Sequence, residues 1–278
     1  MKLSDYIAKR LLAYGVDHVF MITGGGAMHL NDSLGKCKGM NYVCNHHEQA
    51  SAIAAEGYAR TSGKIGVVVV TTGPGGTNTL TGVIGQWFDS VPVLYISGQV
   101  KYETTTASCP SVRLRQLGDQ ELNIVNIVRP ITKYAVMVQD PQHIRYHLEK
   151  ALYLATHGRP GPVWIDIPLN VQGAQIEEGK LVPYDPKEDE IVFDENELRQ
   201  KISRLIEILK QSERPVFVAG HGIRIAEGQD VFFRVIERMK IPILSTFNGF
   251  DLVESNHPLY IGRIGTVGNR AGNFALQN

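Results

Sequence analysis

A glutamate at the opening of an alanine-rich helix, Glu48, is the first candidate for chemistry in this sequence. It stands in the run Asn45–Ala50 (NHHEQA), where an alanine-rich segment predicts a helix over residues 47–61. A carboxylate in a first helical turn also complements the helix dipole, and on spacing alone this structural explanation is the stronger one. The two preceding histidines predict no metal site. Ser51 stands where a zinc-protease motif needs its second histidine, and adjacent side chains point in different directions.

Two glycine-rich turns follow predicted strands. Gly24-Gly25-Gly26 comes after a strand expected at residues 18–22, and Thr72-Gly73-Pro74-Gly75 comes after one expected at residues 67–72. Glycines let the backbone approach a ligand closely, and a turn that opens a helix can cradle that ligand. For the first turn, a flexible strand-to-helix connection is an equally good explanation. The second turn has neither the lysine of a P-loop nor the spacing of a nicotinamide-cofactor fingerprint.

Strand-like and helix-like segments alternate along residues 1–172, which predicts an α/β fold with a mostly parallel sheet. Residues 67–72 are all apolar or β-branched, as is typical of a strand buried on both faces. A polar stretch rich in glycine, proline and charge predicts a linker at residues 173–195. Residues 196–278 then predict the start of a second, incomplete α/β domain.

Charge and composition exclude several classes of partner. Lysine plus arginine and aspartate plus glutamate each total 28, so net charge gives no reason to expect nucleic acid or an acidic membrane surface. No apolar run is long enough to span a bilayer, and charged residues interrupt the amino-terminal segment where a signal peptide would be apolar. The three cysteines show no CxxC spacing, which predicts free thiols in a cytoplasmic protein.

Taken in order, these motifs resemble thiamine-diphosphate enzymes of the acetolactate synthase type. The likeness is carried by HHEQASAIAAEGYARTSGKIGVVVVTTGPGGTNTLTGV, by VDHVFMITGGGAMHL before it, and by ISGQV and DQELNIVNIVRPITKYAVMV after it. RPVFVAGHGIRIAEG and IPILSTFNGFDLVE resemble the start of that family's central domain. The resemblance covers nearly the whole chain. It implies a thiamine-diphosphate pyrimidine-binding domain followed by a partial Rossmann-like central domain.

The resemblance also assigns roles by position. The matching glutamate of the family bonds N1′ of the cofactor's aminopyrimidine, and here that residue is Glu48. Proton sharing at N1′ favours the imino form of the 4′-amino group, which removes the C2 proton of the thiazolium and prepares it to attack a 2-keto acid. Gln120 matches a glutamine that reaches the active site and is the second predicted catalytic residue. The implied cofactor-binding residues are Gly24, Gly25, Gly26, Glu48, Thr72, Gly73, Pro74, Gly75 and Asn78.

The implied cofactors are thiamine diphosphate and Mg²⁺, and the implied assembly is a homodimer or homotetramer with the site between two chains. The family's diphosphate and magnesium motif begins Gly-Asp-Gly and ends in paired asparagines, and neither occurs here. That motif belongs to a third domain, so we expect the domain to be missing and this chain alone to be inactive. Residues 220–222 and 262–266 resemble part of a flavin site, which keeps FAD as a candidate.

The leading prediction is carboligation, in which pyruvate is decarboxylated and the two-carbon fragment joins a second 2-keto acid. A 2-keto-acid decarboxylase or a specialised carboligase on the same fold stays open, because the loop at residues 101–118 is long and carries Arg113 and Arg115. Asp119 also stands before Gln120 where the family usually has phenylalanine. A non-catalytic oligomerising subunit is the third alternative, which the missing domain favours and the intact Glu48 opposes.

Overall fold

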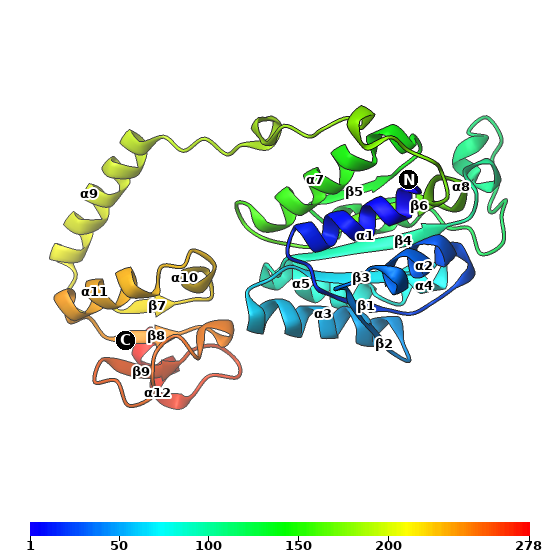
Figure 1. Cartoon of the computed structure of the whole chain (residues 1–278). Coiled ribbons are helices and arrows are strands. Elements are labelled where there is room, and N and C mark those ends of the chain that lie inside the picture. Colours follow the sequence, from blue (N-terminus) through cyan, green and yellow to red (C-terminus); the bar gives the residue numbers. More distant parts are fainter. The chain divides into compact units, whose positions relative to one another are not determined.

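The computed structural model describes residues 1–278 and divides into two compact units, Met1–Ile191 and Val192–Asn278. The first unit contains a six-stranded sheet in the order β2-β1-β3-β4-β6-β5, and every neighbouring pair is parallel (Figure 1). Its strands are β1 (His18–Met21), β2 (Asn41–Cys44), β3 (Gly66–Val70), β4 (Val93–Gln99), β5 (Tyr134–Met137) and β6 (Val163–Pro168). This confirms the predicted α/β class with a parallel sheet.

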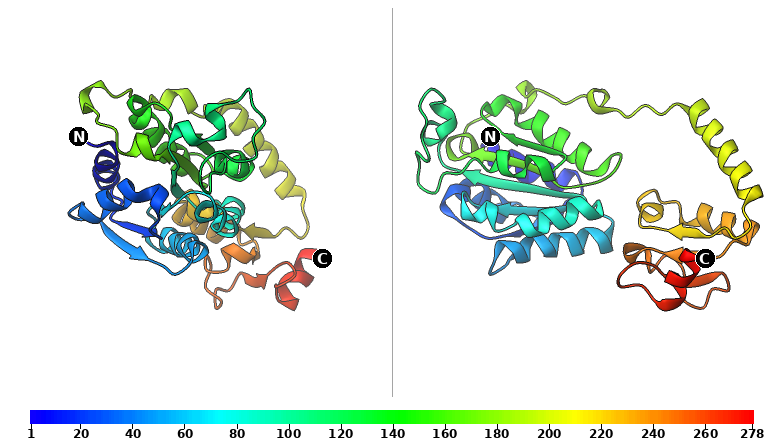
Figure 2. Two further views of the ribbon diagram at one scale, coloured as in Figure 1. Left: turned by 90° about the vertical axis from the view of Figure 1, so that its right-hand side faces the viewer. Right: turned by 180° about the vertical axis from the view of Figure 1, so that it is seen from behind.

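Helices cover both faces of this sheet, as Figure 2 shows. One face packs against α1 (Leu3–Ala13), α2 (Met28–Lys36), α7 (Ile144–Thr156) and α8 (Leu169–Gln172). The other packs against α3 (Glu48–Ser62), α5 (Leu80–Asp89) and α6 (Ile124–Val128).

The alternation of side chains along β3 explains why this strand reads as continuously apolar. Val67 and Val69 belong to one hydrophobic core, whereas Val68 and Val70 belong to the other. Successive residues of a strand point to opposite faces, so a strand covered on both faces needs apolar residues throughout. The edge strand β2 is instead exposed along its whole length.

The second unit is a three-stranded parallel sheet, β7 (Phe217–Ala219), β8 (Ile243–Ser245) and β9 (Tyr260–Arg263), in that order. Its helices are α9 (Glu195–Gln211), α10 (Gly222–Ile225), α11 (Gln229–Met239) and α12 (Arg270–Gln277). The sequence predicts β7, β8, α9, α11 and the start of α12 to within a few residues. It does not predict β9, and it predicts a turn at residues 220–222, where α10 begins. The core around Ile236 and Ile243 is small, and α9 contributes no buried residue to it.

The stretch that the sequence predicts as a linker, residues 173–195, is divided by the structure. Its first part up to Ile191 lies in the first unit. Ile176 and Leu181 are buried in that unit's core, and a backbone bridge joins Lys2 to Gln175.

No helix of the chain has both the length and the hydropathy that crossing a bilayer requires.

Candidate active site

The predicted site residues gather at one edge of the six-stranded sheet, where parallel strands end. Gly24–Gly26 follow β1, Glu48 lies after β2, and the turn Thr72–Gly75 follows β3. β1 lies between β2 and β3, so the three connections are neighbours in space as well. Ligands of open parallel sheets bind outside the carboxyl ends of their strands, which makes this edge the expected place for a site.

Glu48 is joined to the second glycine turn by a hydrogen bond. It is the first residue of α3, after His47, whose side chain accepts from the Gln49 amide. Asn78 Nδ2 donates to Glu48 Oε2 at 2.9 Å. No group of the chain donates a hydrogen bond to the other carboxylate oxygen, Oε1, and the Glu48 side chain is only partly buried. Asn78 therefore fixes the orientation of the carboxylate and leaves one oxygen available for a ligand.

The two glycine turns pack directly on each other through Thr71. The amide of Gly26 donates to Thr71 Oγ1 at 3.0 Å. A Cβ on Gly24 would lie 2.5 Å from the Thr71 Cβ, and one on Gly75 would lie 2.8 Å from its Cγ2. Packing alone therefore requires glycine at positions 24 and 75. Gly25 differs, because it is exposed and a Cβ there would meet nothing within 4 Å. Gly25 is the position where backbone faces open space that a ligand could fill.

The Gln120 loop lies against the second turn, so the structure brings Gln120 and the turn at Thr72–Gly75 together. A Cβ on Gly73 would lie 2.4 Å from the Gln120 carbonyl oxygen. Gly73 has φ +60° and Gln120 has φ +56°, so both occupy the left-handed region, which is unfavourable for a residue with a side chain. The Gln120 side chain is exposed. The loop conformation thus depends on glycine at position 73.

Glu121 holds the long loop that precedes Gln120, a role that the sequence analysis does not predict. Its side chain is buried. Oε1 accepts hydrogen bonds from the Thr106 amide at 3.1 Å and hydroxyl at 2.9 Å, and Oε2 accepts from the Leu117 amide at 3.3 Å. The loop is therefore tied back at two points. Arg113 and Arg115, which it carries, are exposed and form no ion pair.

Asp166 in β6 is a buried carboxylate near the carboxyl end of its strand. The sequence analysis does not predict it either. It is fully buried, with no cation beside it. Ser97 Oγ donates to its Oδ1 at 2.5 Å and Gln99 Nε2 to its Oδ2 at 3.1 Å. Burial raises the pKa of Asp166 to about 6, although these hydrogen bonds act in the opposite direction. The only local signal was a polar residue inside an otherwise apolar strand.

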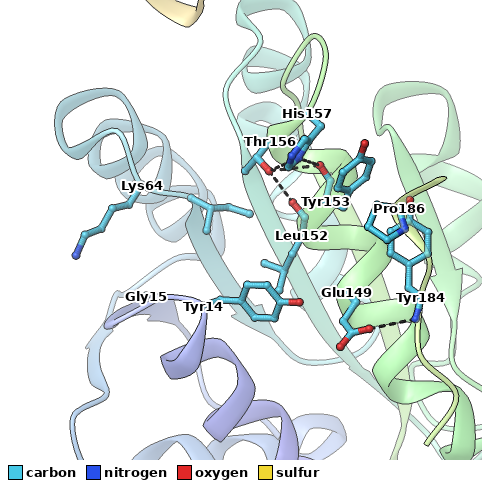
Figure 3. Close-up of a pocket in the computed structure, with 11 residues that line it drawn as sticks. Tyr14, Gly15, Lys64, Glu149, Leu152, Tyr153, Thr156, His157, Tyr184 and Pro186 are labelled. Atoms are coloured by element: carbon cyan, nitrogen blue, oxygen red, sulfur yellow. Dashed lines mark hydrogen bonds between the residues drawn. The ribbon is translucent and has the colours of Figure 1, made fainter. Parts of the chain in front are cut away.

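A cavity of about 570 Å³ lies at the opposite edge of the sheet, among residues that precede the strands (Figure 3). Its lining includes Gly15 before β1, Ile65 before β3, and the rings of Tyr14, Tyr153 and Tyr184. None of the predicted site residues lines it. A pocket is usually the first place to look for a site, but here the converging polar groups and glycine turns lie at the other edge. We therefore assign the candidate active site to the carboxyl ends of the strands.

No group of three or more histidine, cysteine, aspartate or glutamate side chains is placed to hold a metal ion. The candidate site offers a carboxylate oxygen of Glu48 and exposed glycine backbone at Gly25. These suit an aromatic ring with hydrogen-bonding nitrogens better than a diphosphate–Mg²⁺ group, which needs oxygen ligands from several side chains.

Comparison with known proteins agrees with this picture in both units. Residues 1–127 match the profile described as thiamine pyrophosphate enzyme, N-terminal TPP binding domain. Residues 202–278 match the profile described as thiamine pyrophosphate enzyme, central domain. The first match contains all the predicted site residues.

Several curated relatives carry acetolactate synthase names. The acetolactate synthase large subunit of Lactococcus lactis is 35% identical over 275 residues, which cover 98% of this chain and 46% of the relative. The probable acetolactate synthase large subunit of Methanocaldococcus jannaschii is 35% identical over 278 residues, or 99% and 45%. Isozyme 2 of Escherichia coli is 34% identical, covering 99% and 47%. The chain thus spans less than half the length of these relatives.

Proposed function

Because the chain belongs to the thiamine pyrophosphate enzyme family, we propose that it supplies the pyrimidine side of the active site in an acetolactate-synthase-type carboligase. The substrates are 2-keto acids. Pyruvate loses carbon dioxide, and the two-carbon unit that remains adds to a second 2-keto acid. The observation that carries the proposal is the Glu48 carboxylate, held by Asn78 beside two glycine turns with one oxygen free.

The chain's own residues have distinct tasks in this proposal. The cofactor, when bound, supplies the electron sink for decarboxylation. Glu48 Oε1 would share a proton with N1′ of the pyrimidine ring, and Asn78, bonded to Oε2, would restrain the carboxylate. Gly25 lets the backbone approach the reacting centre. Gln120 presents its exposed amide from the loop that Gly73 supports.

The rest of the active site is proposed to come from elsewhere. The diphosphate and Mg²⁺ need ligands that the residues described above do not offer, so we place them on a further part of the enzyme, in the other subunit of a pair. Exposed apolar side chains on α3 and α5 support a homodimer or larger assembly, since such patches mark protein contacts. FAD remains a candidate for the second unit on the sequence resemblance alone.

Simple decarboxylation and a specialised carboligation are the alternatives on the same fold. The unpaired Arg113 and Arg115, in the loop that leads to Gln120, favour an acceptor that carries extra negative charge. A non-catalytic subunit is the third alternative, and the free oxygen of Glu48 argues against it.

Product analysis on the full-length protein that contains this chain tests the proposal. With pyruvate, thiamine diphosphate and Mg²⁺, we expect carbon dioxide together with a hydroxy-keto acid. If an aldehyde is the sole organic product, the protein is a decarboxylase and the proposed carboligase function is wrong. No release of carbon dioxide from pyruvate or any other 2-keto acid supplied would leave the non-catalytic subunit as the remaining explanation.

A further inference from the structure

One buried side chain, Gln99 at the end of β4, contacts both loops of the candidate site. It is 1% exposed. Its Oε1 accepts from Thr72 Oγ1 at 2.5 Å and from the Val100 amide at 3.1 Å. Its Nε2 donates to the Leu122 carbonyl at 2.9 Å and to Asp166 Oδ2 at 3.1 Å. All four of its hydrogen-bonding positions are therefore used.

The partners of Gln99 lie at functionally separate places. Thr72 opens the glycine turn that continues through Gly73 to Asn78, the residue that orients Glu48. Leu122 follows the catalytic-loop residue Gln120 by two positions. These partners are 27 and 23 residues from Gln99 along the chain, so the amide joins segments that sequence keeps apart.

Asp166 orients the Gln99 amide together with the Leu122 carbonyl and the Val100 amide. The carboxylate accepts hydrogen bonds, so the amide nitrogen must face it and the amide oxygen must face Thr72. Ser97 completes the arrangement, because its hydroxyl donates to Asp166 and accepts from Trp164 Nε1 at 2.8 Å. Each polar group in this buried hydrogen-bond network has a partner, which is the condition under which such a network makes a core more rigid.

We propose that Gln99, held by Asp166, is a positioning residue that fixes the Thr72–Asn78 turn and the Gln120 loop relative to each other. The catalytic consequence rests on the function proposed above. Gln99 itself does not touch the reacting atoms. A displacement of about 1 Å in a group that must meet a substrate can cost about 10²-fold in rate, so a fixed separation of the two loops matters for turnover.

The same domain contains a matched control, Gln86 in α5, which is also fully buried. It accepts a hydrogen bond from the Tyr95 hydroxyl at 2.7 Å and donates one to the Ala52 carbonyl at 2.9 Å. Both glutamines therefore link a hydroxyl to a main-chain carbonyl in the core. Only the partners of Gln99 belong to the candidate site, so a comparison of the two separates positioning from general core stability.

The first test measures amide hydrogen exchange in the full-length protein without substrate. In Gln99→Met, peptides that cover residues 72–78 and 117–123 should exchange faster than in the wild type, while peptides from the middle of α3 should not change. In Gln86→Met, peptides from the middle of α3 should exchange faster than in the wild type, while peptides that cover residues 72–78 and 117–123 should not change. If both loops exchange at the same rate in Gln99→Met as in the wild type, the proposal is overturned. This readout does not depend on any enzymatic activity.

The second test measures turnover of pyruvate by the same holoenzymes. We expect Gln99→Met to lower kcat by about tenfold or more while changing KM little, and Gln86→Met to leave both nearly unchanged. Equal losses of kcat in the two variants would reduce Gln99 to an ordinary core residue and overturn the proposal. If the wild type does not turn over pyruvate, the proposed function fails, and the exchange patterns still decide the positioning role.

A milder variant covers the case in which Gln99→Met does not fold. Thr72→Val keeps the shape of the side chain and removes only the hydroxyl that donates to Gln99. It should speed exchange in residues 72–78 and leave residues 117–123 unchanged, because the bond to Leu122 persists. Unchanged exchange in residues 72–78 would contradict the link between Gln99 and the turn.

Discussion

At the scale of single residues, the site depends on polar groups whose partners are specified one by one. Asn78 donates to one oxygen of Glu48 and leaves the other free. Asn78→Leu should release the Glu48 carboxylate and lower kcat by roughly 10-fold or more, because a proton-sharing group must be held in position. Steady-state kinetics of the full-length enzyme measure this. Unchanged kcat would show that Asn78 does not orient the carboxylate.

The raised pKa of Asp166 should make the free energy of unfolding depend on pH. Burial raises the pKa of Asp166 to about 6 from its ordinary value of 3.8. Between these values the folded state binds a proton that the unfolded chain has lost, so the contribution of this residue to stability falls as pH rises. The loss is on the order of 2–3 kcal/mol across about pH 4 to 7.

Urea unfolding of the wild type and Asp166→Asn over that pH range checks this prediction. The other carboxyl groups contribute equally to both proteins, so the difference between their free energies of unfolding isolates Asp166. The advantage of the wild type should shrink as pH rises. A difference that stays constant across the range would show that Asp166 does not titrate there.

At the scale of elements, the two glycine turns and the Gln120 loop pack without room for added side chains. Gly73→Ala should destabilise the protein by roughly 1–3 kcal/mol, because φ is +60° and the new Cβ would lie 2.4 Å from the Gln120 carbonyl. Gly25→Ala meets nothing within 4 Å, so stability should change by less than about 0.5 kcal/mol.

Calorimetry measures both the stability of these variants and their affinity for the cofactor. Unfolding scans measure the stability of the two glycine variants, and titration of the full-length protein with thiamine diphosphate measures affinity. We expect Gly25→Ala to weaken cofactor binding without loss of stability. Equal stability of Gly73→Ala and the wild type would contradict the close approach of the Gln120 loop.

The sequence predicts these elements more completely than it predicts their contacts. Alanine richness predicts α3, an unbroken apolar and β-branched run predicts β3, and the parallel sheet follows from the alternation of helices and strands. β9 was missed because its four residues, Tyr260–Arg263, include a glycine and a charge. The glycine turns stand out because they form local motifs, and the role of Glu48 is assigned by the family resemblance. Gln99 and Asp166 were not predicted, because the partners that join them to other segments lie 23 to 69 residues away and leave no local pattern.

At the scale of the whole molecule, the exposed apolar surface predicts an assembly. On α5 the exposed fractions are 36% for Trp87 and 67% for Phe88, and on α3 it is 51% for Ile53. Phe88→Glu should therefore weaken self-association of the full-length protein, since it places a charge in the surface that we propose a second copy covers. Sedimentation velocity over a range of concentrations measures this.

A matched change elsewhere controls for the added charge. Val192 is 85% exposed and lies outside α3 and α5. Val192→Glu should leave the association state as it is in the wild type. If Phe88→Glu sediments like the wild type as well, the α3–α5 surface is not the contact between copies.

In the function that we propose, Glu48 promotes loss of the C2 proton of bound thiamine diphosphate. Nuclear magnetic resonance can follow exchange of that proton with deuterium in the full-length protein, with no substrate present. We expect Glu48→Gln to slow the exchange by about 10²- to 10⁴-fold, the range typical of a lost acid–base group. Glu56→Gln, on the same helix but paired with Arg60, should exchange like the wild type. Wild-type exchange in Glu48→Gln would contradict the account.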